Sequence, residues 1–392
     1  MRVVLATDAI FPPLTGIGRY ALELATRLPD CPQIEQLRYL GMWRWVGQPP
    51  ADEPAQRDRV EAMTSTGPRL ARLRASMAGK PWAVTAFGVV SEVWRGHLLR
   101  AGRGAVYHSP NYFLAPYDGP SVATVHDLSI TRFPETHPAA RRRYFDIAFE
   151  RSLRRATALI TDSEAVRQEV MHDYGMAPER ITAVHLGVDP AFHPRPAHAI
   201  EPLLRRWGLQ AGSYLLSVST LEPRKRLEQL ITAYAQLDAQ TRQRCPLVLT
   251  GSPGWLHERI DALIEQGRAA GWLRYLGYVP QADLPALYAG ARAFAMVSIY
   301  EGFGLPLLEA MASGVPVLTS DRSCMPEVAG GAALLTDPDD VHAIADGLRR
   351  VLHDDAWRAA AVPSGLARAR LLTWERCVEQ TLAVYQRAAD AA

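Results

Sequence analysis

Short apolar segments alternate with helical patterns along almost the whole chain, and this alternation constrains the fold more than any other feature of the sequence. In the first half, segments of strand length lie at 3–6, 37–42, 105–108, 122–126, 158–162 and 181–186, and helical patterns lie at 17–28, 139–156 and 163–174. Strands that alternate with helices form mostly parallel sheets that are covered on both faces. The sequence therefore predicts an α/β fold with doubly wound, Rossmann-like sheets.

A proline-rich stretch from Val188 to Pro202 divides this alternation into two series. Its Asp-Pro, His-Pro, Arg-Pro and Glu-Pro steps disfavour both a helix and an interior strand. A second alternating series follows, and a chain of 392 residues is long enough for two domains. We therefore expect an N-terminal domain over 1–190, a C-terminal domain over 203–374, a cleft between them, and a last helix over 375–392 that packs back on the first domain.

Composition argues against a nucleic-acid-binding, exported or membrane-spanning protein. The 43 basic and 41 acidic side chains leave a formal net charge of only +2, which is too small to attract a polyanion. The four cysteines stand far apart in the sequence, without the close spacing of disulfide or metal-binding motifs. This pattern is typical of the reduced thiols of a cytoplasmic protein. Asp8 and two prolines interrupt the apolar N-terminus before a signal-peptide core could form. We expect a cytoplasmic location.

One stretch, 69–103, is both basic and apolar. It holds seven basic residues and one acidic residue, interleaved with leucine, valine, phenylalanine and tryptophan. Such a stretch can lie on an anionic membrane surface as a peripheral contact. A helical hairpin with a solvated basic face has the same pattern, and the sequence leaves both interpretations open.

The densest functional signal is the segment Glu-Gly-Phe-Gly-Leu-Pro-Leu-Leu-Glu at 301–309. Gly302 and Gly304 permit a tight turn and a close approach of the backbone to a ligand, and the proline suits the start of a helix whose first amides bind anions. Glu301 and Glu309 flank this turn. Carboxylates accept hydrogen bonds from sugar hydroxyls. The segment therefore indicates a ligand that carries both phosphate and a polyol, such as a nucleotide-sugar.

A second segment, Glu-Pro-Arg-Lys-Arg at 222–226, follows a predicted strand and opens a predicted helix. Adjacent fixed cations can neutralise a diphosphate and stabilise it as charge develops on the departing oxygen. A basic triplet alone is more often a solvated surface. Its position after a strand, in the same domain as the two glutamates, favours phosphate binding by Arg224 and Lys225.

Together these segments resemble glycosyltransferase family 4, whose members are retaining enzymes of the GT-B fold, with two Rossmann-like domains facing across a cleft. The Glu-x7-Glu spacing and the Glu-Pro-Arg-Lys string carry the resemblance, which extends over essentially the whole chain. It implies a retaining hexosyltransferase in which Glu301, Arg224 and Lys225 are catalytic. It also implies that the donor is bound by Gly302, Phe303, Gly304, Leu305 and Glu309.

Two further groups gain their roles only through this resemblance. The Gly-Ile-Gly sequence at 16–18 is a weak dinucleotide fingerprint by itself, but it is similar to the family's glycine loop, which implies donor binding by Gly16 and Gly18. Gly251, Tyr278 and Val279 follow predicted strands of the second domain, and the resemblance places them beside the nucleotide.

His126 ends a predicted strand within a Thr-Val-His-Asp string. Open α/β sheets expose ligand-facing groups at this end of their strands, and imidazole can donate, accept or take up a proton near neutral pH. Without context, such a histidine is more often structural. The resemblance implies that His126 contacts the transferred sugar or the acceptor, with Asp127 in a catalytic or an orienting role.

An Asp-Pro-Asp pattern at 337–339 has the spacing of metal-diphosphate sites in other transferases. Arg224, Lys225 and a helix terminus compete for the same phosphate, and no cluster of histidine and cysteine suggests zinc. We therefore expect no metal and no cofactor, apart from the nucleotide-sugar co-substrate.

The opening segment from Asp8 to Tyr20, together with the Thr-Val-His-Asp string, is similar to bacterial mannosyl- and rhamnosyltransferases of surface polysaccharide synthesis, the class that builds lipopolysaccharide O-antigen. This similarity favours GDP-mannose or GDP-rhamnose over a UDP-sugar as donor. It implies a saccharide or lipid-linked saccharide as acceptor, which would explain the 69–103 stretch and a place on the cytoplasmic face of the inner membrane.

Other protein classes share the expected fold. A dehydrogenase would need a glycine fingerprint tight against its strand and an acid at the end of the second strand, and both are missing. A sugar-nucleotide epimerase would alter the donor without an acceptor. A non-catalytic binding protein could lose the charged residues, whereas Glu301, Arg224 and Lys225 are all present.

Overall fold

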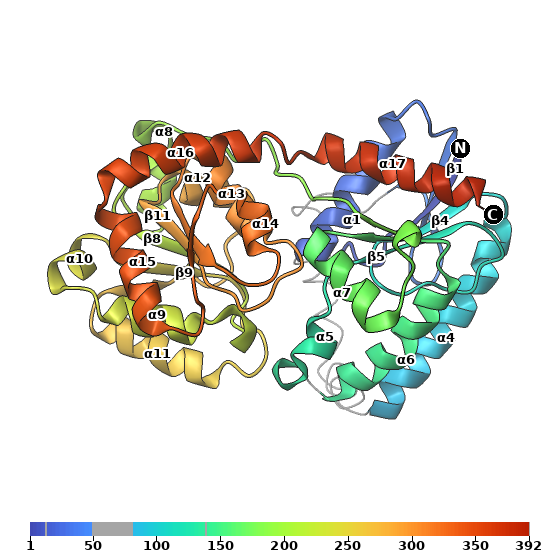
Figure 1. Ribbon diagram of the computed structural model, residues 1–392, viewed down its shortest axis with the longest axis horizontal. Coiled ribbons are helices and arrows are strands. Elements are labelled where there is room, and N and C mark those ends of the chain that lie inside the picture. Colours follow the sequence, from blue (N-terminus) through green and yellow to red (C-terminus); the bar gives the residue numbers. More distant parts are fainter. Residues whose placement is uncertain (12–13, 49–80, 138, 392) are drawn as a thin grey trace. The chain divides into compact units, whose positions relative to one another are not determined.

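The computed structural model describes residues 1–11, 14–48, 81–137 and 139–391, with side chains described except at 81–87, 139–141 and 143–144. These residues fall into two compact units (Figure 1). Unit 1 comprises Met1–His185 with Trp374–Ala392, and unit 2 comprises Leu186–Thr373. Each unit is an α/β domain built on a mostly parallel sheet, as the sequence predicts.

Unit 1 contains a seven-stranded sheet in the order β3-β2-β1-β4-β5-β6-β7. Its strands are β1 (Arg2–Ala6), β2 (Gln36–Leu40), β3 (Trp45–Val46), β4 (Val106–Ser109), β5 (Ser121–Val125), β6 (Ala158–Thr161) and β7 (Ile181–Ala183). Neighbouring strands are parallel, except that β3 pairs antiparallel with β2 at the edge. Parallel strands are buried on both faces and are therefore nearly continuous apolar runs, which is why the sequence predicts all of them except the two-residue β3.

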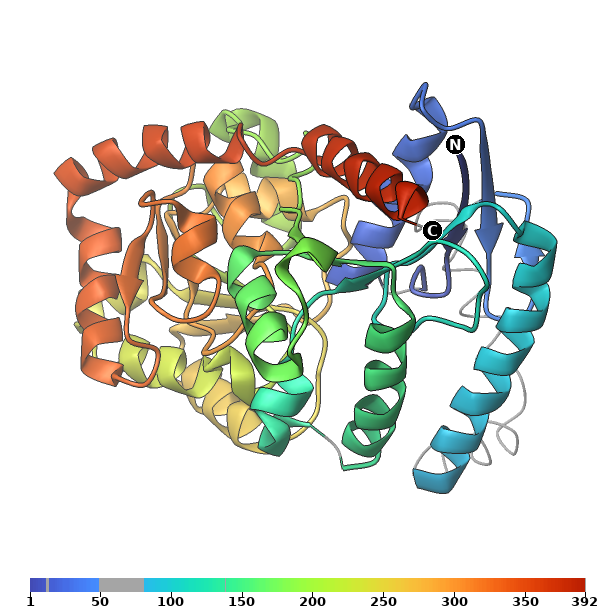
Figure 2. The ribbon, with the colours of Figure 1, turned by 45° about the vertical axis from the view of Figure 1, so that its right-hand side comes forward.

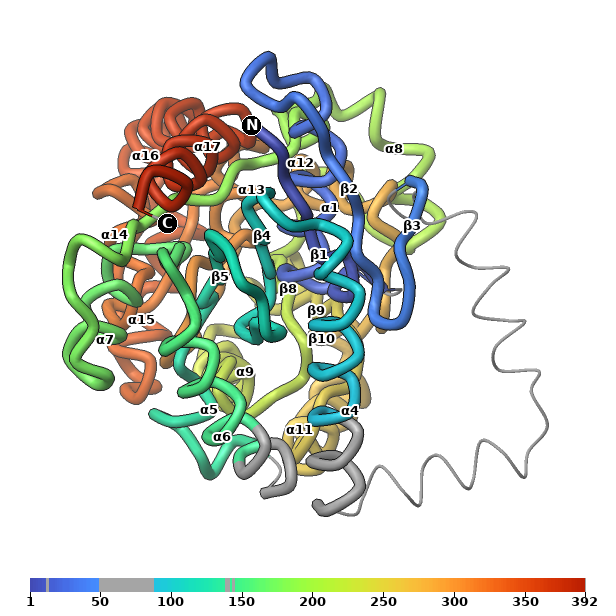
Figure 3. The backbone as a smooth tube through the Cα atoms, turned by 90° about the vertical axis from the view of Figure 1, so that its right-hand side faces the viewer, coloured from blue at the N-terminus to red at the C-terminus, as the bar shows by residue number. Residues whose placement is uncertain are grey.

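Helices cover both faces of this sheet. The helices are α1 (Gly16–Arg27), α4 (Pro81–Leu99), α5 (Ser129–Arg132), α6 (Ala139–Arg155), α7 (Glu164–Tyr174) and α17 (Trp374–Asp390). Phe145 and Phe149 of α6 pack with Val4 and Ala6 in one apolar core. Helix α4 runs beside α6 (Figure 2), while α17 contacts α1 and the strands β4, β5 and β6 (Figure 3).

A buried hydrogen-bond chain holds α17 against this sheet. Tyr385 Oη lies 2.6 Å from Nδ1 of His108 on β4, and the Nε2 atom of His108 lies 2.8 Å from Thr124 Oγ1 on β5. Burial lowers the pKa of His108 to about 3, so its imidazole is neutral and can donate to one hydroxyl while it accepts from the other. The last helix thus packs back on the first sheet, as predicted.

Unit 2 contains a six-stranded parallel sheet in the order β10-β9-β8-β11-β12-β13. Its strands are β8 (Leu215–Val218), β9 (Leu247–Thr250), β10 (Leu273–Tyr275), β11 (Ala293–Met296), β12 (Val317–Ser320) and β13 (Leu334–Thr336). Its helices are α8 (Ala197–Arg206), α9 (Leu227–Ala235), α10 (Ala239–Arg244), α11 (Glu258–Ala269), α12 (Leu284–Ala289), α13 (Leu305–Ala312), α14 (Met325–Ala329), α15 (Val341–His353) and α16 (Asp355–Ala369). Leucines and isoleucines of α9, α11 and α15 form one core with alternate residues of the strands.

Helix α8 corrects one expectation from the sequence. The prolines of the 188–202 stretch were expected to exclude a helix, yet Pro202 lies inside α8. A proline within a helix removes one backbone hydrogen bond. The buried side chains of Ile200 and Leu204 offset this loss, because they fix one apolar face of α8 against unit 2.

The order of strands places a favourable ligand site in each sheet. In the first sheet, successive strands of the chain extend from β1 toward one edge and from β4 toward the opposite edge, so the strand order reverses between β1 and β4. The strand order of the second sheet reverses in the same way between β8 and β11. Loops that leave the carboxyl ends of two such neighbours run apart and make room for a ligand. In unit 2 these loops contain 219–226 and 297–304.

Candidate functional site

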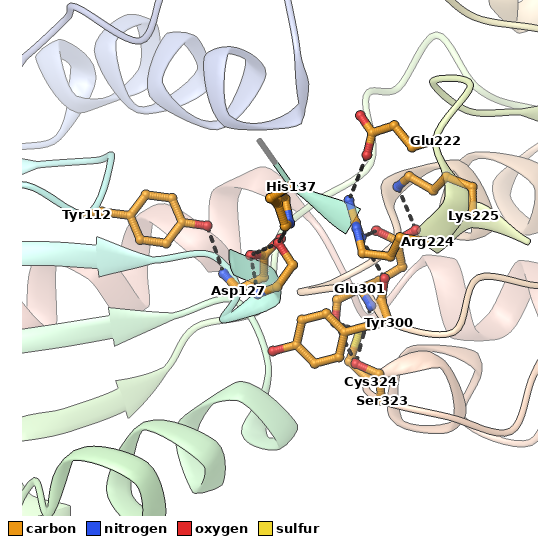
Figure 4. Close-up of polar contacts among 11 residues, drawn as sticks. Tyr112, Asp127, His137, Glu222, Arg224, Lys225, Tyr300, Glu301, Ser323 and Cys324 are labelled. Atoms are coloured by element: carbon orange, nitrogen blue, oxygen red, sulfur yellow. Dashed lines mark hydrogen bonds and ion pairs between the residues drawn. The ribbon is translucent and has the colours of Figure 1, made fainter. Parts of the chain in front are cut away.

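Three charged side chains meet at the carboxyl ends of β8 and β11 in unit 2 (Figure 4). Glu301 Oε1 lies 2.6 Å from Lys225 Nζ, and Glu301 Oε2 lies 3.0 Å from Arg224 Nη1. Arg224 Nη1 also donates a 2.5 Å hydrogen bond to the carbonyl of Tyr300. The backbone amide of Ile299 donates to the carbonyl of Arg224 at 3.0 Å, which joins the two loops. The structure thus brings together the three residues of this unit that the sequence predicts to be catalytic, and their catalytic role stays a prediction.

The cluster is strongly coupled because it is buried. The side chains of Glu301, Arg224 and Lys225 are 9, 10 and 13% exposed. Burial raises the pKa of Glu301, but the positive charges of Lys225 and Arg224 outweigh burial and lower that pKa to about 2. Glu301 is therefore a carboxylate at neutral pH that fixes both cations in place.

The ammonium group of Lys225 retains capacity for a ligand. It carries three donors, and among the described residues only Glu301 accepts a hydrogen bond from it. The remaining donors suit the oxygens of a phosphate, which accept charge-assisted hydrogen bonds.

Three positioning contacts were not predicted from the sequence. The carboxylate of Glu222, in the same loop as Arg224, lies 3.6 Å from Arg224 Nη2. Ser323 Oγ donates to the carbonyl of Glu301 at 2.6 Å, and Cys324 Sγ donates to the same carbonyl at 3.1 Å. The spacing of Ser323 and Cys324 in the chain gives no signal for these bonds, because both residues approach Glu301 from the loop after β12.

The turn that follows Glu301 leads directly into α13. Gly304 adopts a φ of 94° at the N-cap position, which a residue with a Cβ rarely adopts. Gly302 is buried, Phe303 is buried with 3% exposure, and Leu305 is the first residue of the helix. Pro306 has no amide proton, and the amides of Leu307 and Leu308 donate to the carbonyl of Gly304. In the first turn of α13 the amide of Leu305 is therefore the one suited to binding an anion.

Glu309 lies one helical turn further along α13 and is half-buried. Its neighbour is Tyr288 of α12. Burial is the main reason that the pKa of Tyr288 lies well above its ordinary value, and the Glu309 carboxylate raises this pKa further. A position beside Tyr288 is compatible with the donor-binding role predicted for Glu309, which remains a prediction.

Gly251, Tyr278 and Val279 lie in the loops after β9 and β10. The amide of Gly251 donates to the carbonyl of Gly277 at 2.8 Å, which joins these loops. Tyr278 is 46% exposed, whereas Val279 is buried. An exposed tyrosine ring beside a fixed loop can stack on a nucleotide base, and the donor-binding role of these three residues stays a prediction.

Replacing Gly251 with alanine is expected to destabilise unit 2 by about 3 kcal/mol. A Cβ atom there would lie 2.0 Å from the carbonyl oxygen of Ser219, and the φ of 144° is strained for any L residue. Urea unfolding of the variant tests this result, with Gly271→Ala as the control, since a Cβ at Gly271 meets nothing within 4 Å although its φ of 79° is also positive. Equal losses in the two variants would show that φ, and not the contact with Ser219, decides the cost.

In unit 1, Gly16 and Gly18 form the start of α1. Thr15 is the N-cap residue, and its Oγ1 accepts a 3.4 Å hydrogen bond from the amide of Gly18. A Cβ at Gly18 would lie 2.9 Å from the carbonyl oxygen of Ala9, so the loop after β1 passes too close to the helix for a larger residue. This packing requires glycine at 18 whether or not a donor binds there.

His126 has internal partners on both ring nitrogens. Nδ1 lies 2.7 Å from Asp162 Oδ2, and Nε2 lies 2.8 Å from the carbonyl oxygen of Pro110. Burial alone lowers the pKa of His126, but the charge of Asp162 raises it above its ordinary value, and a doubly protonated ring donates to both partners. The described contacts make His126 a link between β5, β6 and the loop after β4, and its contact with substrate stays a prediction.

Asp127 organises the loop after β5. Its Oδ1 accepts hydrogen bonds from the amide and the hydroxyl of Ser129 at 2.9 and 2.8 Å, and its own amide donates to Tyr112 Oη at 3.1 Å. These bonds, drawn in Figure 4, shape the loop after β5, and both roles that the sequence leaves open for Asp127 stay predictions.

The Asp-Pro-Asp pattern lies after β13, and both of its carboxylates pair with arginines. Asp337 Oδ2 lies 2.8 Å from Arg322 Nη2, and Asp339 Oδ1 lies 2.7 Å from Arg226 Nη2. Within the described ranges, no three side chains of histidine, cysteine, aspartate or glutamate group closely enough to hold a metal ion.

Two family models and several known proteins match this chain. Residues 14–192 match the family described as "Glycosyltransferase Family 4", and residues 206–365 match "Glycosyl transferases group 1". The O-antigen chain mannosyltransferase B of Escherichia coli is 39% identical over 98% of this chain and 100% of its own length. The serotype-specific mannosyltransferase WbdA of Escherichia coli is 33% identical over 68% of this chain, which spans 34% of WbdA.

A solved structure has the same fold. HepE of Anabaena, in complex with UDP and glucose, superposes with a TM-score of 0.71 at 18% identity, and the match covers 99% of this chain and 100% of HepE. At such low identity the likeness concerns the fold alone. A relative that matches along its whole length at 39% identity shows the family: the chain belongs to glycosyltransferase family 4, as a sugar-transferring enzyme of the GT-B fold.

Proposed function

We propose that the enzyme transfers mannose from a nucleotide-sugar to a growing surface polysaccharide of the O-antigen type. GDP-mannose is the favoured donor and GDP-rhamnose the second. Two relatives that carry the name mannosyltransferase support the choice of sugar. The observation that carries the proposal is the buried Lys225, which has donors to spare beside Arg224 and Glu301, at the ligand-binding edge of a parallel sheet.

The cluster suits the departure of a nucleoside diphosphate. As the bond between the sugar and the diphosphate breaks, negative charge develops on the leaving oxygen, and Lys225, Arg224 and the amide of Leu305 at the start of α13 stabilise it. Glu301 holds the two cations before the donor arrives, so that little reorganisation is needed. In the proposed retaining reaction, the acceptor hydroxyl attacks from the side that the diphosphate leaves and gives its proton to that phosphate. This chemistry requires no metal ion and no strong protein base.

The proposed acceptor is a saccharide carried on a lipid. The four cysteines are free thiols, as expected of a protein in the reducing cytoplasm. No helix of the described residues is long and apolar enough to cross a membrane. We place the enzyme in the cytoplasm, with peripheral contact to the inner membrane, where a lipid-linked acceptor would be found.

Thermal unfolding with a panel of nucleotide-sugars tests the donor. A ligand at a hundred times its Kd stabilises the folded state by about 2.7 kcal/mol, and we expect GDP-mannose to raise Tm more than GDP-rhamnose, UDP-glucose or UDP alone at equal concentration. Lys225→Ala is the control, since it should lose most of this shift. A larger shift with UDP-sugars would reject the GDP donor.

NMR of the product's anomeric proton tests the stereochemistry of transfer. We expect the configuration of the donor sugar to be retained, and an inverted linkage would disprove retention.

A further inference from the structure

Helix α4 is oriented with its charges inward. Glu92 is 9% exposed and its carboxylate lies 3.1 Å from Arg155 Nη1 of α6. Arg95 is 8% exposed, and its Nη2 lies 3.1 Å from both Asp8 Oδ1 and Tyr107 Oη. Arg95 is therefore not one of the surface cations that the sequence places in the 69–103 stretch, and of that stretch the part at 69–80 lies outside the described residues.

The opposite side of α4 is mostly apolar and exposed, and the exposed His97 lies on it beside Trp94, with ring centroids 5.9 Å apart. Val89, Val90, Val93 and Trp94 are 41, 59, 64 and 46% exposed, and their spacing places them in one stripe along the helix. The indole N–H of Trp94 donates a 2.9 Å hydrogen bond to the carbonyl of Trp43, which extends the stripe onto the loop between β2 and β3. We call this surface the α4 apolar face, comprising Met42, Trp43, Val89, Val90, Val93 and Trp94.

This arrangement reverses the usual amphipathic pattern. A helix on a water-soluble domain turns its apolar stripe to the core and its charges to water. Single exposed apolar residues are common, but a contiguous stripe with two exposed tryptophans marks a surface that contacts another apolar phase. Two buried ion pairs fix α4 in this orientation, so rotation of the helix cannot hide the stripe.

Charges beside the stripe indicate which phase it contacts. Arg100 and Arg103 follow the C-terminal end of α4, and Arg44 lies next to Trp43; all three are exposed, with Arg103 3.9 Å from Asp118 at the surface. Tryptophan is favoured at the boundary between headgroups and acyl chains, and arginine is attracted to anionic headgroups. A lipid interface also accepts one helix face without a complementary partner surface.

We propose that the α4 apolar face docks unit 1 on an anionic membrane, with the valines and tryptophans at acyl depth and the arginines at the headgroups. The docking itself follows from α4, and its use for reaching a lipid-linked acceptor rests on the function proposed above. The enzyme would thus act at the lipid surface without a membrane-spanning segment.

Flotation with vesicles of phosphatidylethanolamine and phosphatidylglycerol tests the docking. Two added carboxylates at an anionic surface should weaken binding on the order of tenfold or more, so Val90→Asp/Val93→Asp should lose flotation. Leu335→Asp/Leu371→Asp is the matched control, because these leucines of unit 2 are 43 and 53% exposed, and it should float like the unsubstituted enzyme. Arg100→Gln/Arg103→Gln should lower flotation on phosphatidylglycerol vesicles and leave the weaker flotation on phosphatidylcholine unchanged.

Two results would overturn the proposal. One is equal flotation of the α4 variant and its control. The other is a change in the mass of the α4 variant by light scattering without vesicles, which would make the face a contact between protein copies. Transfer to a water-soluble acceptor should be equal in the unsubstituted enzyme and all these variants. If the unsubstituted enzyme itself showed no transfer, that result would count against the proposed function and not against the docking.

Discussion

Alanine in place of Lys225 is expected to lower kcat/KM for sugar transfer by about a hundred- to a thousand-fold, the usual effect of removing one fixed donor from a developing oxyanion. Lys225 Nζ is 2.6 Å from Glu301 and has further donors for the diphosphate. The fall should appear mainly in kcat, because charge on the leaving oxygen is greatest in the transition state. Steady-state kinetics with the donor identified by thermal unfolding provide the measurement.

Arg226→Gln is the matched control for this experiment. It removes one positive charge from the next position in the same triplet, but the guanidinium of Arg226 pairs with Asp339, 2.7 Å away, and not with Glu301. Its rate should stay within about threefold of the unsubstituted enzyme, as for an exposed ion pair. If both variants lost activity equally, general electrostatics and not a specific phosphate contact would explain the effect.

Glutamine in place of Glu301 is expected to destabilise unit 2 by about 3 kcal/mol at neutral pH, because it leaves two buried cations without their carboxylate. The pKa of Glu301 falls from its ordinary 4.5 in the unfolded chain to about 2 in the folded protein. A lowered pKa means that the stabilisation is complete above the unfolded value and is lost as the pH falls toward the folded value. The difference between the two proteins should therefore shrink between pH 4.5 and 2.

Urea unfolding over a pH series, with a probe in unit 2, measures this difference. Glu265→Gln serves as control, since Glu265 is 68% exposed and, of the described residues, pairs only with Arg268 at the surface. A constant gap between the Glu301 variant and the unsubstituted enzyme over this range would show that folding does not lower the pKa of Glu301, against its pairing with two cations. We also expect the Glu301 variant to lose transfer activity, since Arg224 and Lys225 would no longer be fixed.

The sequence predicts the two sheets well for a physical reason. Strands of a parallel sheet are buried on both faces, so each appears as an apolar run such as Val3 to Ala6, and helices lie between the runs. Residues 222–226 and 301–309 each follow one strand, but only the strand order makes β8 and β11 neighbours. The sequence therefore predicts the components of the charged cluster, whereas the fold shows that Arg224, Lys225 and Glu301 touch.

Contacts between distant segments could not be predicted in this way. Arg95 looks like a surface cation until Asp8 and Tyr107 are seen to surround it. Likewise, the two ring nitrogens of His126 bond to Asp162 and to the carbonyl of Pro110, although neither residue is near His126 in the chain. Ser323 supports Glu301 through the backbone, an interaction for which side-chain patterns provide no signal.

Unit 1 cannot finish folding until the ribosome has made α17, which comes last in the chain. Unit 2 is one continuous segment, whereas unit 1 is made of the segments that precede and follow it in the sequence, and it needs Tyr385 to close over His108. During translation, the nascent first sheet therefore emerges with one side uncovered and must wait until the whole of unit 2 has been synthesised. Unit 2 can finish folding earlier, and a chaperone that shields nascent chains would be needed most for the half that is made first.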